Sequence, residues 1–165
     1  MSDQMLHHLF NHIPSIGQII GLLLLVYSMM IKSAPVTKAA LLVILVSAIA
    51  VMPANATGEG AEESTEELAG VNHDQIHRHE EAAESAFVIT LVSGAIALVS
   101  LVASWRKWSF ANAANWVLLL TGAVSIYFLV IASHEGGLIR HPEMGNTAVQ
   151  SGVGGQEGEE MEDDD

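Results

Sequence analysis

The segment that decides the fold reads His73-Asp74-Gln75-Ile76-His77-Arg78-His79-Glu80-Glu81-Ala82-Ala83-Glu84. It contains no proline or glycine and continues directly into an apolar segment. Such a stretch is typical of a helix that begins in water and then enters a membrane. The histidines and acids of this helix, which we expect over residues 74–105, are the reference for interpreting the rest of the chain.

The apolar residues collect in four blocks, with hardly any charge inside them. Each block has about 17–23 residues, enough to cross about 30 Å of hydrocarbon as a helix. We therefore predict an all-α protein, a four-helix transmembrane bundle, over residues 1–142. The predicted helices cover residues 13–31, 36–52, 74–105 and 112–132. Pro14 is expected in the first turn of the first helix.

The chain of 165 residues has no cysteine and a formal net charge of −13. The absence of cysteine excludes disulfides, thiolate metal sites and cysteine nucleophiles. The acidic residues are concentrated, with five in residues 59–67 and seven in residues 157–165. Residues 57–70 are therefore expected to form a polar loop, and residues 143–165 a disordered acidic tail. The few basic residues do not suit nucleic-acid binding.

The positive charges predict how the bundle is oriented. Lysine and arginine lie mainly in or beside the two short links between helices, at Lys32, Lys38, Arg106 and Lys107. Because such residues are retained in the cytoplasm, we expect the short links there and both termini on the periplasmic or extracellular side. The chain is then a multi-pass protein of the inner (cytoplasmic) membrane.

The eight histidines all fall on the side predicted to be periplasmic: His7, His8, His12, His73, His77, His79, His134 and His141. A b-type haem needs two axial imidazoles and a dry pocket, which a helix bundle supplies. His12 and His79 form the first predicted axial pair, because each lies within about two turns of its apolar segment. His7 and His141 are predicted as a second pair or as residues that flank the pocket. One or two haems are expected.

Two other interpretations of the histidines stay open. His73 and His77 are four residues apart, on one helical face that Glu81 extends, and could hold copper, zinc or iron. Alternatively, the histidines bind no cofactor and are solvated or sense pH. No motif for a serine nucleophile or a phosphate loop occurs, so we expect an electron carrier rather than an enzyme.

Several short motifs resemble a known family, the predicted membrane proteins of domain-of-unknown-function family twenty-two thirty-one. Its typical opening, His-Pro-x-x-x-His-x-Pro, corresponds to His7-His8-Leu9-Phe10-Asn11-His12-Ile13-Pro14, with His8 in place of proline. Thr57-Gly58-Glu59 and His79-Glu80-Glu81-Ala82-Ala83 match two further motifs. The ending Gly136-Gly137-Leu138-Ile139-Arg140-His141-Pro142 is similar to the family's last motif, but lacks its tyrosine and final glycine.

The resemblance spans residues 6–142 and implies a four-helix, histidine-containing membrane protein. Some members of the family are fused to Rieske iron–sulfur domains, which implies electron transfer at the outer face. The function expected is therefore a bis-histidine haem b protein that transfers electrons to a periplasmic cytochrome or Rieske protein. The alternative is a metal-binding or structural accessory subunit, without enzymatic activity, of a larger respiratory-type complex in the membrane.

Overall fold

The computed structural model describes residues 3–66 and 73–140, and side chains within residues 12–58 and 74–139. Four helices account for nearly all of this part of the chain: α1 (Asp3–Met30), α2 (Ala34–Glu66), α3 (His73–Arg106) and α4 (Ala111–Arg140). Each contains a stretch that is long and apolar enough to cross a membrane. The prediction of an all-α chain with four potential membrane spans is confirmed.

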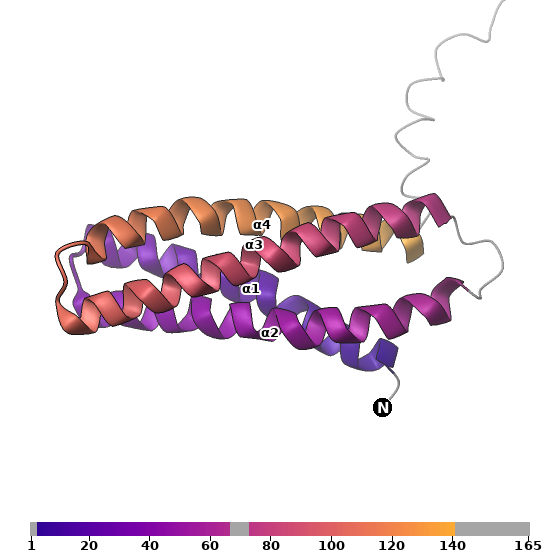
Figure 1. The fold of residues 1–165 in the computed structure, drawn as a ribbon, viewed down its shortest axis with the longest axis horizontal. Helices are drawn as coiled ribbons and strands as arrows, with labels where there is room; N and C mark the ends of the chain where they lie inside the picture. The colour runs from indigo at the N-terminus through magenta and orange to yellow at the C-terminus, as the bar shows by residue number, and fades with distance from the viewer. Residues whose placement is uncertain (1–2, 67–72, 141–165) are drawn as a thin grey trace, which may run out of the picture.

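The helices form an antiparallel bundle in which each contacts the next in sequence and α4 also contacts α1 (Figure 1). Of these four pairs, α1–α2 and α3–α4 pack most extensively and α1–α4 packs least. Residues 31–33 and 107–110 lie together at what we call the link end. Asp3, Glu66, His73 and Arg140 lie at the opposite end, which we call the terminal end.

The helices are longer than the apolar segments that predicted them. Pro14 is inside α1, which begins at Asp3, so its predicted place in the first turn is wrong. Residues 57–66, predicted as loop, continue α2, and α4 extends beyond residue 132 to Arg140. A helix that is already formed gains one hydrogen bond for each residue added, and a glycine costs only about 1 kcal/mol. A polar segment that follows an apolar helix therefore does not by itself end the helix.

Small residues determine how closely the helices approach. A Cβ on Gly17 would overlap the Ser47 hydroxyl, and one on Gly21 would overlap the side chain of Ile44. Gly17 and Gly21 thus allow α1 to approach α2 closely. Gly94 of α3 faces α2 in the same way. In a membrane, where apolar burial no longer drives association, such backbone proximity maximises the dispersion contacts between helices.

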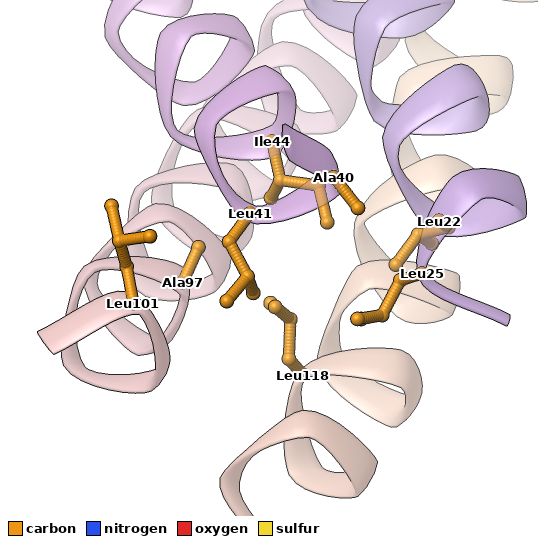
Figure 2. Close-up of a cluster of buried hydrophobic side chains, with 8 residues drawn as sticks. All are labelled: Leu22, Leu25, Ala40, Leu41, Ile44, Ala97, Leu101 and Leu118. Carbon is orange, nitrogen blue, oxygen red and sulfur yellow. The ribbon is translucent and has the colours of Figure 1, made fainter. Parts of the chain in front are cut away.

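The main core lies in the half of the bundle nearer the link end, and all four helices contribute to it (Figure 2). Its buried members are Leu22, Leu25, Ala40, Leu41, Ile44, Ala97, Leu101 and Leu118. Large apolar side chains such as Leu23, Met30 and Leu120 point outward and are exposed. That inverted distribution is expected for a surface that faces lipid.

Nearer the terminal end, a second cluster of Ala86, Leu129 and Ala132 joins α3 to α4. Between the two clusters, the hydroxyls of Thr90 and Ser125 are 2.7 Å apart and buried. This hydrogen bond connects α3 to α4 at a depth where water cannot satisfy either group.

Candidate functional site

Seven of the eight predicted histidines lie in α1, α3 and α4, in the parts of these helices nearer the terminal end. His7, His8 and His12 are in the first part of α1, His73, His77 and His79 begin α3, and His134 is near the end of α4. The side chains of His7, His8 and His73 are not described. His141 and the predicted acidic tail lie outside the described residues.

Among the histidines whose side chains are described, His79 is the one that the fold holds most firmly. Its Nδ1 is 2.9 Å from the backbone carbonyl oxygen of Ala132 on α4, and its side chain is half-buried. A carbonyl oxygen only accepts, so Nδ1 donates the hydrogen, and in the neutral ring the lone pair is then on Nε2. A backbone carbonyl bonded to one ring nitrogen is a common way to orient an imidazole that binds a metal through the other.

The absence of a side chain on Gly136 makes this contact possible. A Cβ at Gly136 would lie 3.0 Å from Cε1 of His79 and 3.2 Å from its Nδ1. By contrast, a Cβ at the neighbouring Gly137 would meet nothing within 4 Å. Of the two adjacent glycines, only Gly136 provides the space for the ring.

Arg78, the residue before His79, also contacts α4. Its Nε lies 3.5 Å from Oε2 of Glu135, whose side chain is 20% exposed. The contact is an ion pair without hydrogen-bond geometry, because this oxygen has no hydrogen-bond partner among the described residues. Arg78 and His79 together attach the start of α3 to the last turns of α4.

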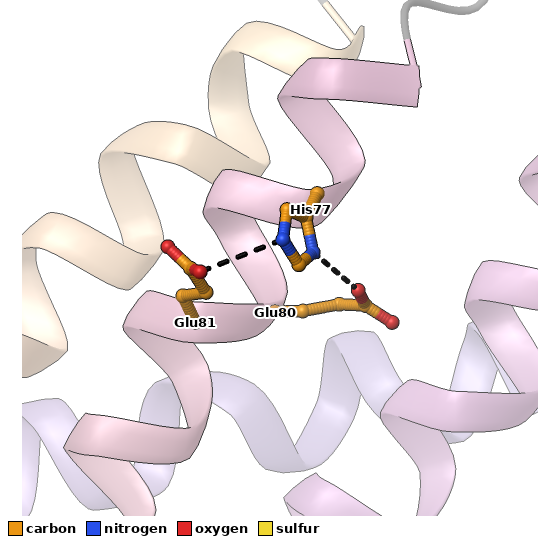
Figure 3. Close-up of polar contacts among 3 residues, drawn as sticks. All are labelled: His77, Glu80 and Glu81. Atoms are coloured by element: carbon orange, nitrogen blue, oxygen red, sulfur yellow. Dashed lines mark hydrogen bonds and ion pairs between the residues drawn. The ribbon is translucent and has the colours of Figure 1, made fainter.

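His77 points to solvent between two carboxylates of its own helix (Figure 3). Nδ1 is 3.4 Å from Oε2 of Glu80, and Nε2 is 3.5 Å from Oε1 of Glu81. Two members of the predicted metal set, His77 and Glu81, are therefore close together. Among the described side chains no group of three or more histidine or acidic residues is arranged to hold a metal ion.

The heights of His12 and His79 along the bundle differ. Gly17 of α1 and Gly94 of α3 face neighbouring residues of α2, so these glycines lie at similar heights. His12 is 5 residues from Gly17 toward the terminal end, whereas His79 is 15 residues from Gly94 in the same direction. At 1.5 Å per residue, His79 lies about 15 Å farther out. The contacts with α4 place the two histidines in the same order. Leu22 of α1 lies beside Gly122 of α4, and Thr90 of α3 bonds to Ser125 of α4. Counted from these contacts, His79 lies about 6 Å farther out than His12.

The sequence did not single out Arg78, Glu135 or Ala132 as part of this site. Ala132 contributes only a backbone carbonyl, which every residue has, and the Arg78–Glu135 pair joins positions far apart in the chain. The one available signal was the Gly136-Gly137 pair, which also carries part of the family resemblance.

Comparisons with protein-family models, curated proteins and solved structures found no match. The resemblance to domain-of-unknown-function family twenty-two thirty-one therefore stays a prediction. The fold defines a class: over the described residues the protein is all-helical, with four potential membrane spans and a histidine contact between α3 and α4 at one end.

Proposed function

We propose that the protein is a multi-pass membrane haem b protein that transfers electrons at its terminal end. The observation that carries the proposal is the orientation of His79, through the 2.9 Å contact between Nδ1 and the Ala132 carbonyl. This contact leaves Nε2 as the nitrogen that can coordinate, on the side of the ring next to Gly136 of α4. Losing such an orienting partner typically weakens metal binding about 10–100-fold.

The second axial ligand comes from α1. His12 was the first choice from sequence, and its side chain is exposed and thus accessible. Because His79 lies farther toward the terminal end than His12, the heights favour His7, about 7 Å beyond His12 along the helix. His141 keeps its predicted role in a second pair or beside the pocket. When bound, haem would accept and release one electron at a time, while the helices position it and exclude water.

The terminal end is proposed to face the periplasm. Lys32, Lys38, Arg106 and Lys107 lie at or near the link end, which under the positive-inside rule would be cytoplasmic. The acidic residues at the end of α2, together with those of the predicted tail, would attract a basic redox partner, such as a soluble cytochrome or a Rieske protein, by long-range electrostatics.

The test is a dithionite-reduced minus air-oxidised optical spectrum of the detergent-purified chain, with iron analysis of the same sample. Sharp reduced α and Soret bands with stoichiometric iron are expected. His79→Ala should abolish the bands, whereas His77→Ala, which changes an exposed neighbour on the same helix, should leave them intact. His7→Ala and His12→Ala identify the second ligand. Bands that survive in the His79 variant would refute the assignment.

A second candidate rests on His77 and its two carboxylate neighbours, Glu80 and Glu81. With His73, these residues would give an imidazole–carboxylate site for zinc, copper or iron in an accessory subunit of a larger complex. Near-stoichiometric zinc or copper without haem bands, lost in His77→Ala and retained in His79→Ala, would support it. Iron without haem bands, lost in His77→Ala and retained in His79→Ala, would indicate the same site.

A further inference from the structure

A polar hollow of about 370 Å³ opens at the link end, at the opposite end of the bundle from His79. All four helices and both short links contribute to its lining. The residues that matter for its chemistry are Ser28, Lys32, Thr37, Lys107, Asn112 and Asn115. None of them has a part in the proposed haem site.

Two lysines give this hollow its charge. Lys32 and Lys107 follow α1 and α3 in the left-handed conformation, with φ of 53° and 56°. Each sits in the same kind of helix end, closed by a backbone bond from Ser33 N to Ser28 O at 3.0 Å and from Trp108 N to Ala103 O at 2.9 Å. Within the described residues neither lysine forms an ion pair, and every ion pair there lies at the terminal end.

The next helix begins two residues after Lys32 and four residues after Lys107. Ala34 and Ala111, the first residues of α2 and α4, both line the hollow. A helix N-terminus carries a partial positive charge and favours anions. Two helix N-termini and two ammonium groups therefore line the same hollow, which favours a negatively charged ligand.

Asn115, which lines the hollow, carries a side-chain oxygen that is unsatisfied within the described residues. Its side chain is only 6% exposed, and its Oδ1 has no hydrogen-bond partner within the described part of the chain. A buried polar atom without a partner is costly, so native proteins rarely leave one. Oδ1 needs a hydrogen-bond donor, which a bare phosphate at neutral pH does not readily supply but a hydroxyl does.

An apolar groove of about 500 Å³ adjoins the polar hollow. The two share Met29, Lys32 and Asn112, and the groove continues past Val26, Trp116 and Leu119. It lies between α1 and α4, the neighbouring helices that pack least extensively. Exposed apolar side chains flank it, so the groove faces the hydrocarbon of the membrane.

We propose that the link end binds one anionic phospholipid whose headgroup carries a hydroxyl. The phosphate would lie between Lys32 and Lys107, the headgroup hydroxyl would donate to Oδ1 of Asn115, and an acyl chain would occupy the groove. Basic pockets between membrane helices are common sites for anionic headgroups. A choline or ethanolamine headgroup fits less well, because its cation would meet both lysines.

Native mass spectrometry of the full-length protein in detergent tests the proposal, with phosphatidylglycerol and phosphatidylcholine as probes. Phosphatidylglycerol should bind with clear preference. Lys32→Gly and Lys107→Gly should each weaken phosphatidylglycerol binding about fivefold, which corresponds to the loss of one lysine near a membrane surface. Glycine suits the positive φ at both positions, so these variants should fold at least as well. Arg106→Gln, which removes a charge at the same end but outside the hollow, is the matched control.

The remaining arms identify the ligand. Phosphatidylmethanol, anionic but without a headgroup hydroxyl, should bind more weakly than phosphatidylglycerol, and Asn115→Leu should remove that difference. Equal binding of phosphatidylglycerol and phosphatidylcholine would overturn the proposal. So would a loss of phosphatidylglycerol binding in Arg106→Gln as large as the loss in the lysine variants. If inorganic phosphate displaces the lipid at similar concentrations, the site binds a small anion and the lipid assignment is wrong.

Discussion

Nδ1 of His79 on α3 is hydrogen-bonded to the backbone carbonyl oxygen of Ala132 on α4, at 2.9 Å. The carbonyl belongs to a residue buried in the α3–α4 cluster, so the imidazole is attached to the packed part of the bundle. Gly136, four residues later on α4, leaves room for the ring. The orientation of His79, the proposed axial ligand, therefore depends on the position of the α4 backbone. Variants of Gly136 and Gly137 can test this dependence.

Gly136→Ala and Gly137→Ala should behave differently although they make the same chemical change. Alanine in place of a helical glycine stabilises by up to about 1 kcal/mol. We expect that gain for Gly137→Ala, whose Cβ meets nothing within 4 Å. For Gly136→Ala the new Cβ lies 3.0 Å from Cε1 of His79, so the ring must move and the gain should be lost. Thermal unfolding followed by circular dichroism measures both; equal stabilisation would show that the ring is not confined.

Gly17→Ala should destabilise the α1–α2 contact by about 1–3 kcal/mol, as over-packing generally does. The new Cβ would overlap the Ser47 hydroxyl and lie 2.9 Å from Ser47 Cβ. Ser47→Gly removes both atoms, so the double variant should be less destabilised than the sum of the two single variants. Denaturant unfolding in detergent gives the three values. Additive effects would mean that the overlap is relieved elsewhere.

Arg78→Gln should lower the free energy of unfolding by about 1 kcal/mol or less, the usual range for an exposed ion pair. It should cost more than Glu135→Gln, because it leaves a carboxylate that is only 20% exposed without its cation. The coupling in a double-mutant cycle should shrink in high salt, since the Arg78 side chain is 55% exposed. A salt-independent coupling would instead indicate a desolvated pair.

The fold was predictable because hydrocarbon thickness fixes the length of an apolar helix. The same physics explains what the sequence did not show. Hydropathy detects only the part of a helix that is in lipid, so the extension of α2 to Glu66 and the start of α1 at Asp3 were missed. The left-handed Lys32 and Lys107 were missed because glycine, not lysine, is the usual residue at such a helix end.

The candidate site was only partly predictable for a related reason. Distance from an apolar boundary suggested that His12 and His79 share a depth, but depth is set by where each helix contacts its neighbours. The register through Gly17 and Gly94 places His79 farther out. The partner of His79 is a backbone carbonyl, which leaves no trace in a side-chain pattern.

The Thr90–Ser125 pair should contribute a small but measurable coupling between α3 and α4. The hydroxyls are buried and 2.7 Å apart. In membranes such pairs contribute about 0.6 kcal/mol on average and up to about 1.7, because each hydroxyl can instead bond to its own helix. A double-mutant cycle of Thr90→Val and Ser125→Ala measures the coupling. Thr121→Val is the control, since within the described residues Thr121 bonds to two carbonyls of its own helix, at 3.1 and 3.3 Å, and should show no coupling with Thr90. If the Thr90–Ser125 coupling is no larger than this control, packing alone holds the two helices together at that depth.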